Sequence, residues 1–185
     1  MMLLPLAEIL VRRVLTTGIP GAGSIVQHLT LWVGFLGAAL AAREDRLLAI
    51  ATALMLPKPL RAPAAVFAAA ATVAVVTMLF WGALQLIETQ RELGATIALR
   101  LPVWIVQIVL PAAFAAIGVR QITHASHTRV GRVLAATGMG IGALLLLFPS
   151  PLQGRAGWLA LVVVVSAGLA GAPIFAVLGG AAVLL

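Results

Sequence analysis

The chain has 185 residues, of which 63% are hydrophobic and only 9% are charged, and its mean hydropathy is +1.16. A soluble domain carries about 25% charged residues, so this composition cannot cover a water-facing surface. It excludes a soluble protein and predicts an integral membrane protein. The apolar runs are long and continuous rather than alternating, which favours transmembrane helices over barrel strands.

The charges are unbalanced, with twelve lysines and arginines against five acids and a net charge of +7. These charges stand singly or in pairs between apolar runs. Membrane topology and lipid headgroups explain that arrangement better than a nucleic-acid partner, which we do not expect. The sequence has no cysteine, so it offers neither disulfides nor thiol chemistry.

The first two apolar runs are residues 1–15 and residues 25–42, separated by a glycine- and proline-rich loop. The first is short for a span, so we expect the native chain to begin further upstream. The second carries a small-residue face that predicts close packing against another helix, made of Gly34, Gly37 and Ala38. It ends in a charged cluster that marks the membrane surface, with Arg43, Glu44 and Arg46 as interface residues.

The middle of the chain predicts one interfacial helix and two spans. Residues 47–56 are apolar but too short to cross a bilayer, which suits a helix lying in the interface. Residues 62–87 predict a long span, residues 88–100 a polar loop, and residues 101–119 the next span. Gln107 lies inside that last span. An interhelical hydrogen bond is its expected role, with a substrate contact as the alternative.

Residues 120–132 are the most polar stretch and predict a solvated basic loop. His124 and His127 could share a helix face, but two histidines without a nearby third ligand predict no metal site. An intramembrane enzyme is a weak alternative. The candidate catalytic residues would be three histidines and two serines: His28, His124, His127, Ser24 and Ser126. They include no convincing nucleophile–base pair. We expect no catalytic residue and no enzyme activity.

The last third begins with a span at residues 133–148, where Gly138 and Gly142 form a GxxxG helix-packing pattern. A further apolar run, residues 158–170, is interrupted at residues 171–173 by Gly-Ala-Pro, which predicts a broken helix or a tight turn. The run resumes and is still apolar at Leu185, so we expect the native chain to continue.

These elements predict an all-α integral membrane protein. It has a bundle of about four transmembrane helices plus an interfacial helix, followed by one or two further transmembrane helices. We divide it into a four-helix membrane domain (residues 1–130), a connecting helix and loop (131–157) and the truncated start of a second domain (158–185).

The connections at residues 43–61 and 120–132 carry seven lysines and arginines, and the other connections carry five. This excess predicts that the first set, and hence the N-terminus, is cytoplasmic. Trp81, Trp104 and Trp158 then fall toward the outer interface as an aromatic belt, whereas Trp32 is expected to pack within the bundle.

Two stretches resemble the small membrane subunit (Q component) of TRAP transporters, the tripartite ATP-independent periplasmic carriers. The first runs from Arg12 through GIPGAGS to the pattern W-x-x-F-L-G-A-A-x-A-x-R, here Trp32, Phe35, Leu36, Gly37, Ala38, Ala39, Ala41 and Arg43. The second is GATIALRLPVW at residues 94–104. Residues 47–51, LLAIA, depart from the His-Ile pair and acid of many members. From about Gly131 the chain resembles the junction and beginning of the large permease (M component) in fused chains.

The resemblance implies a scaffold role in sodium-driven import of organic acids such as dicarboxylates, sialic acid or keto acids, at the bacterial inner membrane. Its implied partners are the large permease and a periplasmic substrate-binding protein. It implies no cofactor in this segment, because the sodium and substrate sites belong to the large permease. Arg91 and Arg100, in the predicted outer loop, are candidates for contact with the binding protein. The alternative is an independent small carrier or channel that acts as a homo-oligomer.

Overall fold

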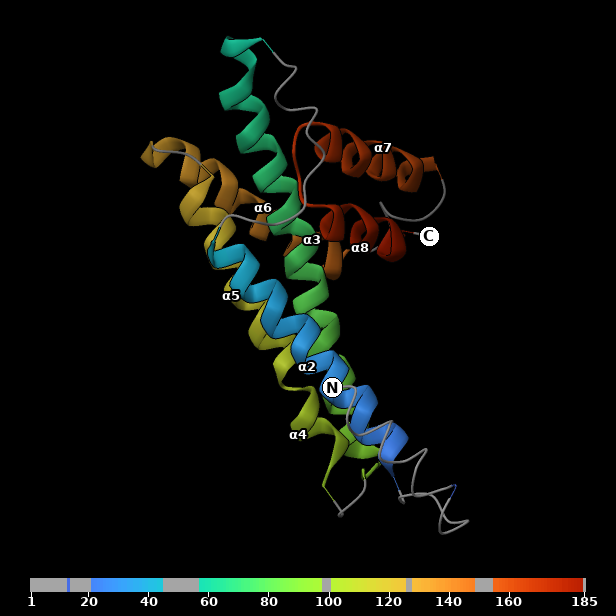
Figure 1. Cartoon of the computed structure of the whole chain (residues 1–185). Helices are drawn as coiled ribbons and strands as arrows, with labels where there is room; N and C mark the ends of the chain where they lie inside the picture. Colours follow the sequence, from blue (N-terminus) through green and yellow to red (C-terminus); the bar gives the residue numbers. More distant parts are fainter. Residues whose placement is uncertain are drawn as a thin grey trace.

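The structure is a computed structural model that describes residues 13, 21–44, 57–97, 101–125, 128–148 and 155–184. Seven helices lie in the described ranges from residue 21 onward (Figure 1): α2 (Ala22–Arg43), α3 (Lys58–Glu92), α4 (Val103–Gln107), α5 (Val109–His124), α6 (Arg129–Leu147), α7 (Arg155–Leu169) and α8 (Ile174–Leu184). Helices α2, α3, α6 and the α4–α5 pair are long and apolar enough to cross a membrane. The predicted all-α membrane class is confirmed. The predicted first span, apart from the helical residue Arg13, and the interfacial helix lie outside the described residues.

The central element is α3, which contacts α4, α5, α6, α7 and α8. Its 35 residues, at 1.5 Å per residue, give a length of about 52 Å, so it extends well past the ends of α2 and α5 (Figure 1). Among the described residues, Thr72 is a buried polar side chain, and its hydroxyl donates to the carbonyl oxygen of Ala68 at 2.7 Å. The Thr72 hydroxyl therefore has its hydrogen bond inside the core.

The long helices alternate in direction. Ala42, Val76 and Ile117 meet in one buried cluster, which joins the end of α2, the middle of α3 and the second half of α5. At the other end Trp32 meets Val106, so α2 and the α4–α5 pair run in the same direction. Helix α3 runs in the opposite direction to α2. Helix α6 lies beside α3 and runs in the same direction as α3.

The predicted span at residues 101–119 is broken at Ile108, between α4 and α5. Pro111 explains the break. Proline has no N–H to donate to the carbonyl of Gln107, four residues earlier, and its ring crowds that carbonyl. The N–H of Ile108 turns back to the Ile105 carbonyl at 3.4 Å, which tightens the chain locally.

Several predicted loops are shorter in the structure. Helix α3 continues through the expected loop as far as Glu92, because Glu, Thr, Gln and Arg sustain a helix until Gly94 adopts φ 61°. The expected basic loop at residues 120–132 is also mostly helical. Helix α5 runs to His124, and α6 begins at Arg129 after Thr128, whose hydroxyl caps the Gly131 N–H at 3.2 Å. The glycine-rich loop likewise ends early, since α2 starts at Ala22.

The Gly-Ala-Pro interruption is a tight turn between α7 and α8. The Ala172 N–H donates to the Ala167 carbonyl at 2.8 Å and the Gly171 N–H to the Gly168 carbonyl at 3.1 Å, with Gly171 at φ 106°. This is a Schellman turn, which requires a left-handed residue and so favours glycine. The resulting helical hairpin packs against α3 (Figure 1).

Candidate functional site

Helices α6 and α3 approach closely at two glycines of α6. A Cβ atom added at Gly138 would overlap the backbone carbonyl of Ala70, and one added at Gly142 would lie 2.6 Å from the Ala74 oxygen. Only glycine permits this approach, which brings two backbones together as in other small-residue contacts between membrane helices. The GxxxG pattern therefore lies at a helix interface in the structure.

The small-residue face of α2 behaves differently. A Cβ atom at Gly34 or Gly37 would meet nothing within 4 Å, and both glycines are exposed. The expected packing of these glycines against another helix is therefore not found among the described residues. The contact of α2 with α5 runs along a neighbouring face instead, where Ala38 packs on the Ile117 cluster and the Phe35 and Phe114 rings meet edge to face at 5.3 Å.

A polar contact inside the apolar region lies at the break between α4 and α5. The Trp32 indole Nε1–H donates to the Val106 carbonyl at 2.7 Å, so this tryptophan joins α2 to α4, while its side chain is 40% exposed rather than packed inside the bundle as expected. Gln107, the next residue, has a buried Oε1 atom with no hydrogen-bond partner within the described ranges. The interhelical hydrogen bond expected of that oxygen is therefore not formed there.

At the end of α3 the chain folds back on itself before entering α4. The Ile97 N–H donates to the Leu101 carbonyl at 2.7 Å, and the Val103 N–H donates to the Ala95 carbonyl at 3.0 Å. This pairing brings Arg91 over the Trp104 ring, with the guanidinium carbon 5.9 Å from the ring centroid. A cation–π contact of this kind holds the arginine at the start of α4.

The remaining predicted interface residues are spread over the fold. Trp81 is 49% exposed in the half of α3 that leads to Arg91, and Trp158 is 67% exposed near the start of α7. The hairpin that contains Trp158 packs on the other half of α3, near Ala68, so it is not brought to the Arg91–Trp104 contact. Arg43 closes the last turn of α2, and Glu44 caps it. Arg46 and Arg100 lie outside the described residues.

The candidate histidines and serine that the structure describes, His28, His124 and Ser24, do not form a catalytic group. The His28 Nδ1 atom donates to the backbone carbonyl of Ser24 at 2.8 Å rather than to its hydroxyl. His124 lies at the far end of α5, where its Nδ1 contacts the Thr123 hydroxyl at 3.0 Å. Over the described ranges, no group of three or more His, Cys, Asp or Glu side chains could hold a metal ion. His127 and Ser126 lie outside those ranges.

One pair of residues was not singled out as a site by the sequence. Arg43 and Arg120 close the α2 and α5 ends of the same pocket, because the two helices run side by side in the same direction. Each arginine follows an apolar run, and that shared feature was the available signal. An apolar run before each arginine does not show that α2 and α5 are neighbours.

A family model for the DctQ component of tripartite ATP-independent periplasmic transporters matches residues 1–130. This chain belongs to the DctQ family. The resemblance to the small permease subunit is thereby confirmed, and the chain is a transmembrane component of a TRAP transporter. The DctQ match spans the described helices α2 to α5 and reaches the start of α6. No curated protein and no solved structure matches the chain.

DctQ proteins work together with a large permease and a periplasmic binding protein. Membership in a family of transporter membrane components agrees with a multi-pass membrane protein made of several apolar helices. The division into domains at residues 130 and 157, and the absence of enzyme activity, stay predictions.

Proposed function

We propose that this DctQ chain is a scaffold for a sodium-coupled secondary transporter that imports organic acids of the dicarboxylate, sialic acid or keto acid class. A periplasmic binding protein delivers the substrate. The large permease, as a fused continuation of this chain or as a separate subunit, holds the sodium and the substrate. The observation that supports this proposal most directly is the DctQ match over residues 1–130.

The arrangement of polar groups supports a scaffold rather than a transport site. The described spans pack through apolar side chains, glycines and backbone contacts, as at Gly138 against Ala70. Transport sites near the membrane midplane use broken helices with polar groups to bind their ions. The break at Ile108 offers one buried amide oxygen, that of Gln107, and no carboxylate from the described residues lies in this helix pair.

The distribution of charge supports an inner-membrane orientation in which the C-terminal end of α2 is cytoplasmic. The predicted first span at residues 1–15 then places the N-terminus in the cytoplasm as well. The end of α2, the start of α3, the end of α5 and the start of α6 lie toward one end of the bundle. They carry Arg43, Lys58, Arg61, Arg120, Arg129 and Arg132. The opposite end carries Arg91 together with Glu88 and Glu92. Basic residues gather on the cytoplasmic side of membrane proteins.

Uptake measurements test the proposal. In the native host, deletion of the gene should abolish sodium-dependent uptake of a labelled dicarboxylate, sialic acid or keto acid, and a plasmid copy should restore it. Proteoliposomes that contain this chain alone should take up none of them. Uptake by the chain alone would favour the independent carrier, and uptake unaffected by replacing sodium with potassium would refute sodium coupling.

A further inference from the structure

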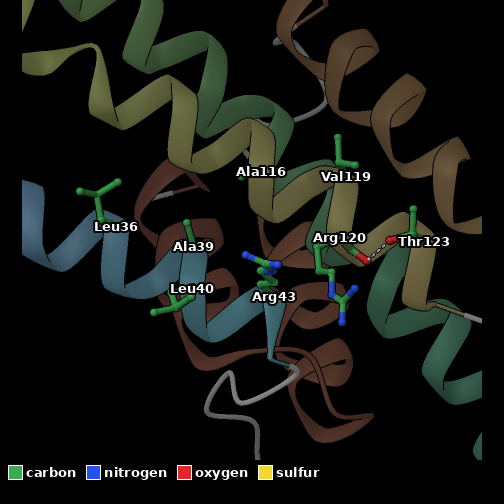
Figure 2. Close-up of a pocket in the computed structure, with 8 residues that line it drawn as sticks. All are labelled: Leu36, Ala39, Leu40, Arg43, Ala116, Val119, Arg120 and Thr123. Carbon is green, nitrogen blue, oxygen red and sulfur yellow. Dashed lines mark hydrogen bonds between the residues drawn. The ribbon is translucent and has the colours of Figure 1, made fainter.

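A pocket of about 520 Å³ lies between α2 and α5 (Figure 2). Its walls are apolar over most of their length, and the side chains of Arg43 and Arg120 stand at the end where α2 stops. In Figure 2 the leucines of α2 lie toward the left and both arginines toward the right. The pocket is therefore amphipathic, with an apolar groove that leads to two cations.

The two arginines are held at that end by the backbone. Arg43 lies in the last turn of α2, where the exposed carbonyls of a helix C-terminus favour a cation. The Arg120 Nε–H donates to the Ala42 carbonyl at 3.3 Å, which fixes its guanidinium group against the end of α2. None of the described residues that line the pocket is acidic. A guanidinium group has five N–H donors, so both arginines keep donors for an anion at the edge of the apolar groove beside the other contacts they make.

The apolar part has the shape of a groove open to the surroundings. Ala39 and Ala116 are small, while Leu36, Leu40 and Val119 are 52%, 55% and 63% exposed. On a membrane-spanning pair of helices this exposed face meets lipid rather than water. A linear hydrocarbon chain therefore fits the groove better than a polar or charged ligand.

We propose that this pocket binds an anionic phospholipid. The headgroup phosphate lies at the guanidinium groups of Arg43 and Arg120, and one acyl chain lies along the groove at Leu36, Leu40 and Val119. Arginine is suited to phosphate because its planar donors make paired, charge-assisted hydrogen bonds. Both arginines end apolar runs, so they lie at the depth of lipid headgroups, and basic pockets between membrane helices are known to favour anionic lipids.

The charge and the groove together select this ligand. A zwitterionic lipid brings its own cation to the two arginines, so it is bound less well by the same contacts. Inorganic phosphate satisfies the arginines but leaves the groove unused. The proposal concerns a lipid of the membrane and does not depend on the solute or the coupling ion of the transporter.

Native mass spectrometry of the purified chain tests the proposal. Phosphatidylglycerol, phosphatidylcholine with the same acyl chains, and inorganic phosphate are offered separately. We expect phosphatidylglycerol to be retained about tenfold more tightly than phosphatidylcholine, and phosphate to be bound weakly. The double variant Arg43→Gln, Arg120→Gln should lose this preference. The variant Arg129→Gln, which removes an exposed arginine outside the pocket, should keep it.

A second variant tests the groove without altering charge. Ala116→Trp fills the groove and should lower phosphatidylglycerol retention while both arginines remain. Added phosphatidylglycerol should also raise the thermal unfolding midpoint of the wild type and of Arg129→Gln but not of the double variant. Equal binding of both lipids by the wild type, or full retention by the double variant, would overturn the proposal. So would loss of large-permease copurification from the double variant with lipid retention unchanged, because the arginines would then serve a protein contact.

Discussion

Gln107 places an amide oxygen in a buried position at the break between α4 and α5. Its Oε1 atom has no hydrogen-bond partner within the described part of the chain. A buried polar atom without a partner loses its hydration and gains nothing in return, which costs about 1–3 kcal/mol. In a member of a family whose proteins work with a large permease, such a residue either destabilises the isolated chain or meets a donor from outside the described ranges.

Replacement of this amide distinguishes those two cases. In the isolated chain, Gln107→Met keeps the size of the side chain and removes the unmet oxygen. We expect the thermal unfolding midpoint in detergent to stay the same or rise. Phe114→Leu, a change in the edge-to-face ring pair, serves as a control that should lower the midpoint. A clear fall for Gln107→Met would mean that the amide already has a partner in the isolated chain.

Arg91 is the described member of the two arginines proposed to meet the binding protein. Its guanidinium group lies 5.9 Å from the centre of the Trp104 ring, which holds it at the bundle end opposite Arg43. We expect Arg91→Ala combined with Arg100→Ala to lower the rate of uptake severalfold without reducing the amount of protein in the membrane. The matched control is Arg129→Ala at the other end. Uptake equal to wild type in the double variant would contradict the assignment.

At the scale of elements, the contact between α3 and α6 depends on glycine at two positions one helical turn apart. Gly138 and Gly142 bring the α6 backbone against Ala70 and Ala74 of α3. Gly140, on the same helix, is exposed and has open space around its missing Cβ. The three glycines therefore provide a matched comparison in one helix.

The two faces should respond to alanine with opposite signs. Gly138→Ala forces the helices apart and should destabilise the protein by about 1–3 kcal/mol, the usual range for overpacking. Gly140→Ala meets no neighbour and should stabilise the helix by about 0.5–1 kcal/mol through lower backbone entropy. Thermal unfolding in detergent measures both. Equal effects of the two substitutions would mean that α6 does not pack on α3 through this face.

Helix existence was predictable from the sequence, but several helix ends were not. The spans stand out because about twenty apolar residues match the bilayer core. The ends at Glu92 and His124 lie beyond the apolar runs, since polar residues such as glutamate, glutamine and arginine continue a helix once it has begun. Hydropathy reports where lipid is tolerated, while backbone hydrogen bonding and left-handed residues such as Gly94 decide where a helix stops.

At the scale of the whole molecule, alternating helix directions collect basic residues at one end of the bundle. The proposed orientation predicts which end faces the cytoplasm. The natural absence of cysteine allows single cysteines to report accessibility. A membrane-impermeant maleimide should label Glu92→Cys in intact cells and should leave Arg129→Cys unlabelled until the cells are permeabilised. Labelling of Arg129→Cys in intact cells would reverse the assigned orientation.

The candidate sites were predictable in part. The residues of the GxxxG pattern, and the interfacial place of Arg43 at the end of an apolar run, follow from residue type and spacing. Their partners do not, because Ala70, Ala74 and Arg120 are distant in sequence and no pattern in the sequence pairs them with these residues. Gly34 and Gly37 looked equally suited to packing, yet they lie on an exposed face of α2.

An α-helical membrane component could be read from the residues alone, because the bilayer permits few ways to satisfy a backbone and few lengths for a span. The motif residues from Trp32 to Arg43 indicated the family that the DctQ match confirms. The sequence did not determine which faces meet. The spans are apolar on all sides, so lipid and helix neighbours are chemically alike and periodicity gives no direction. The packed helices were needed to show that Gly138 and Gly142 face α3 and that Arg43 and Arg120 share one pocket. Such choices depend on backbone distance and shape rather than on hydrophobicity.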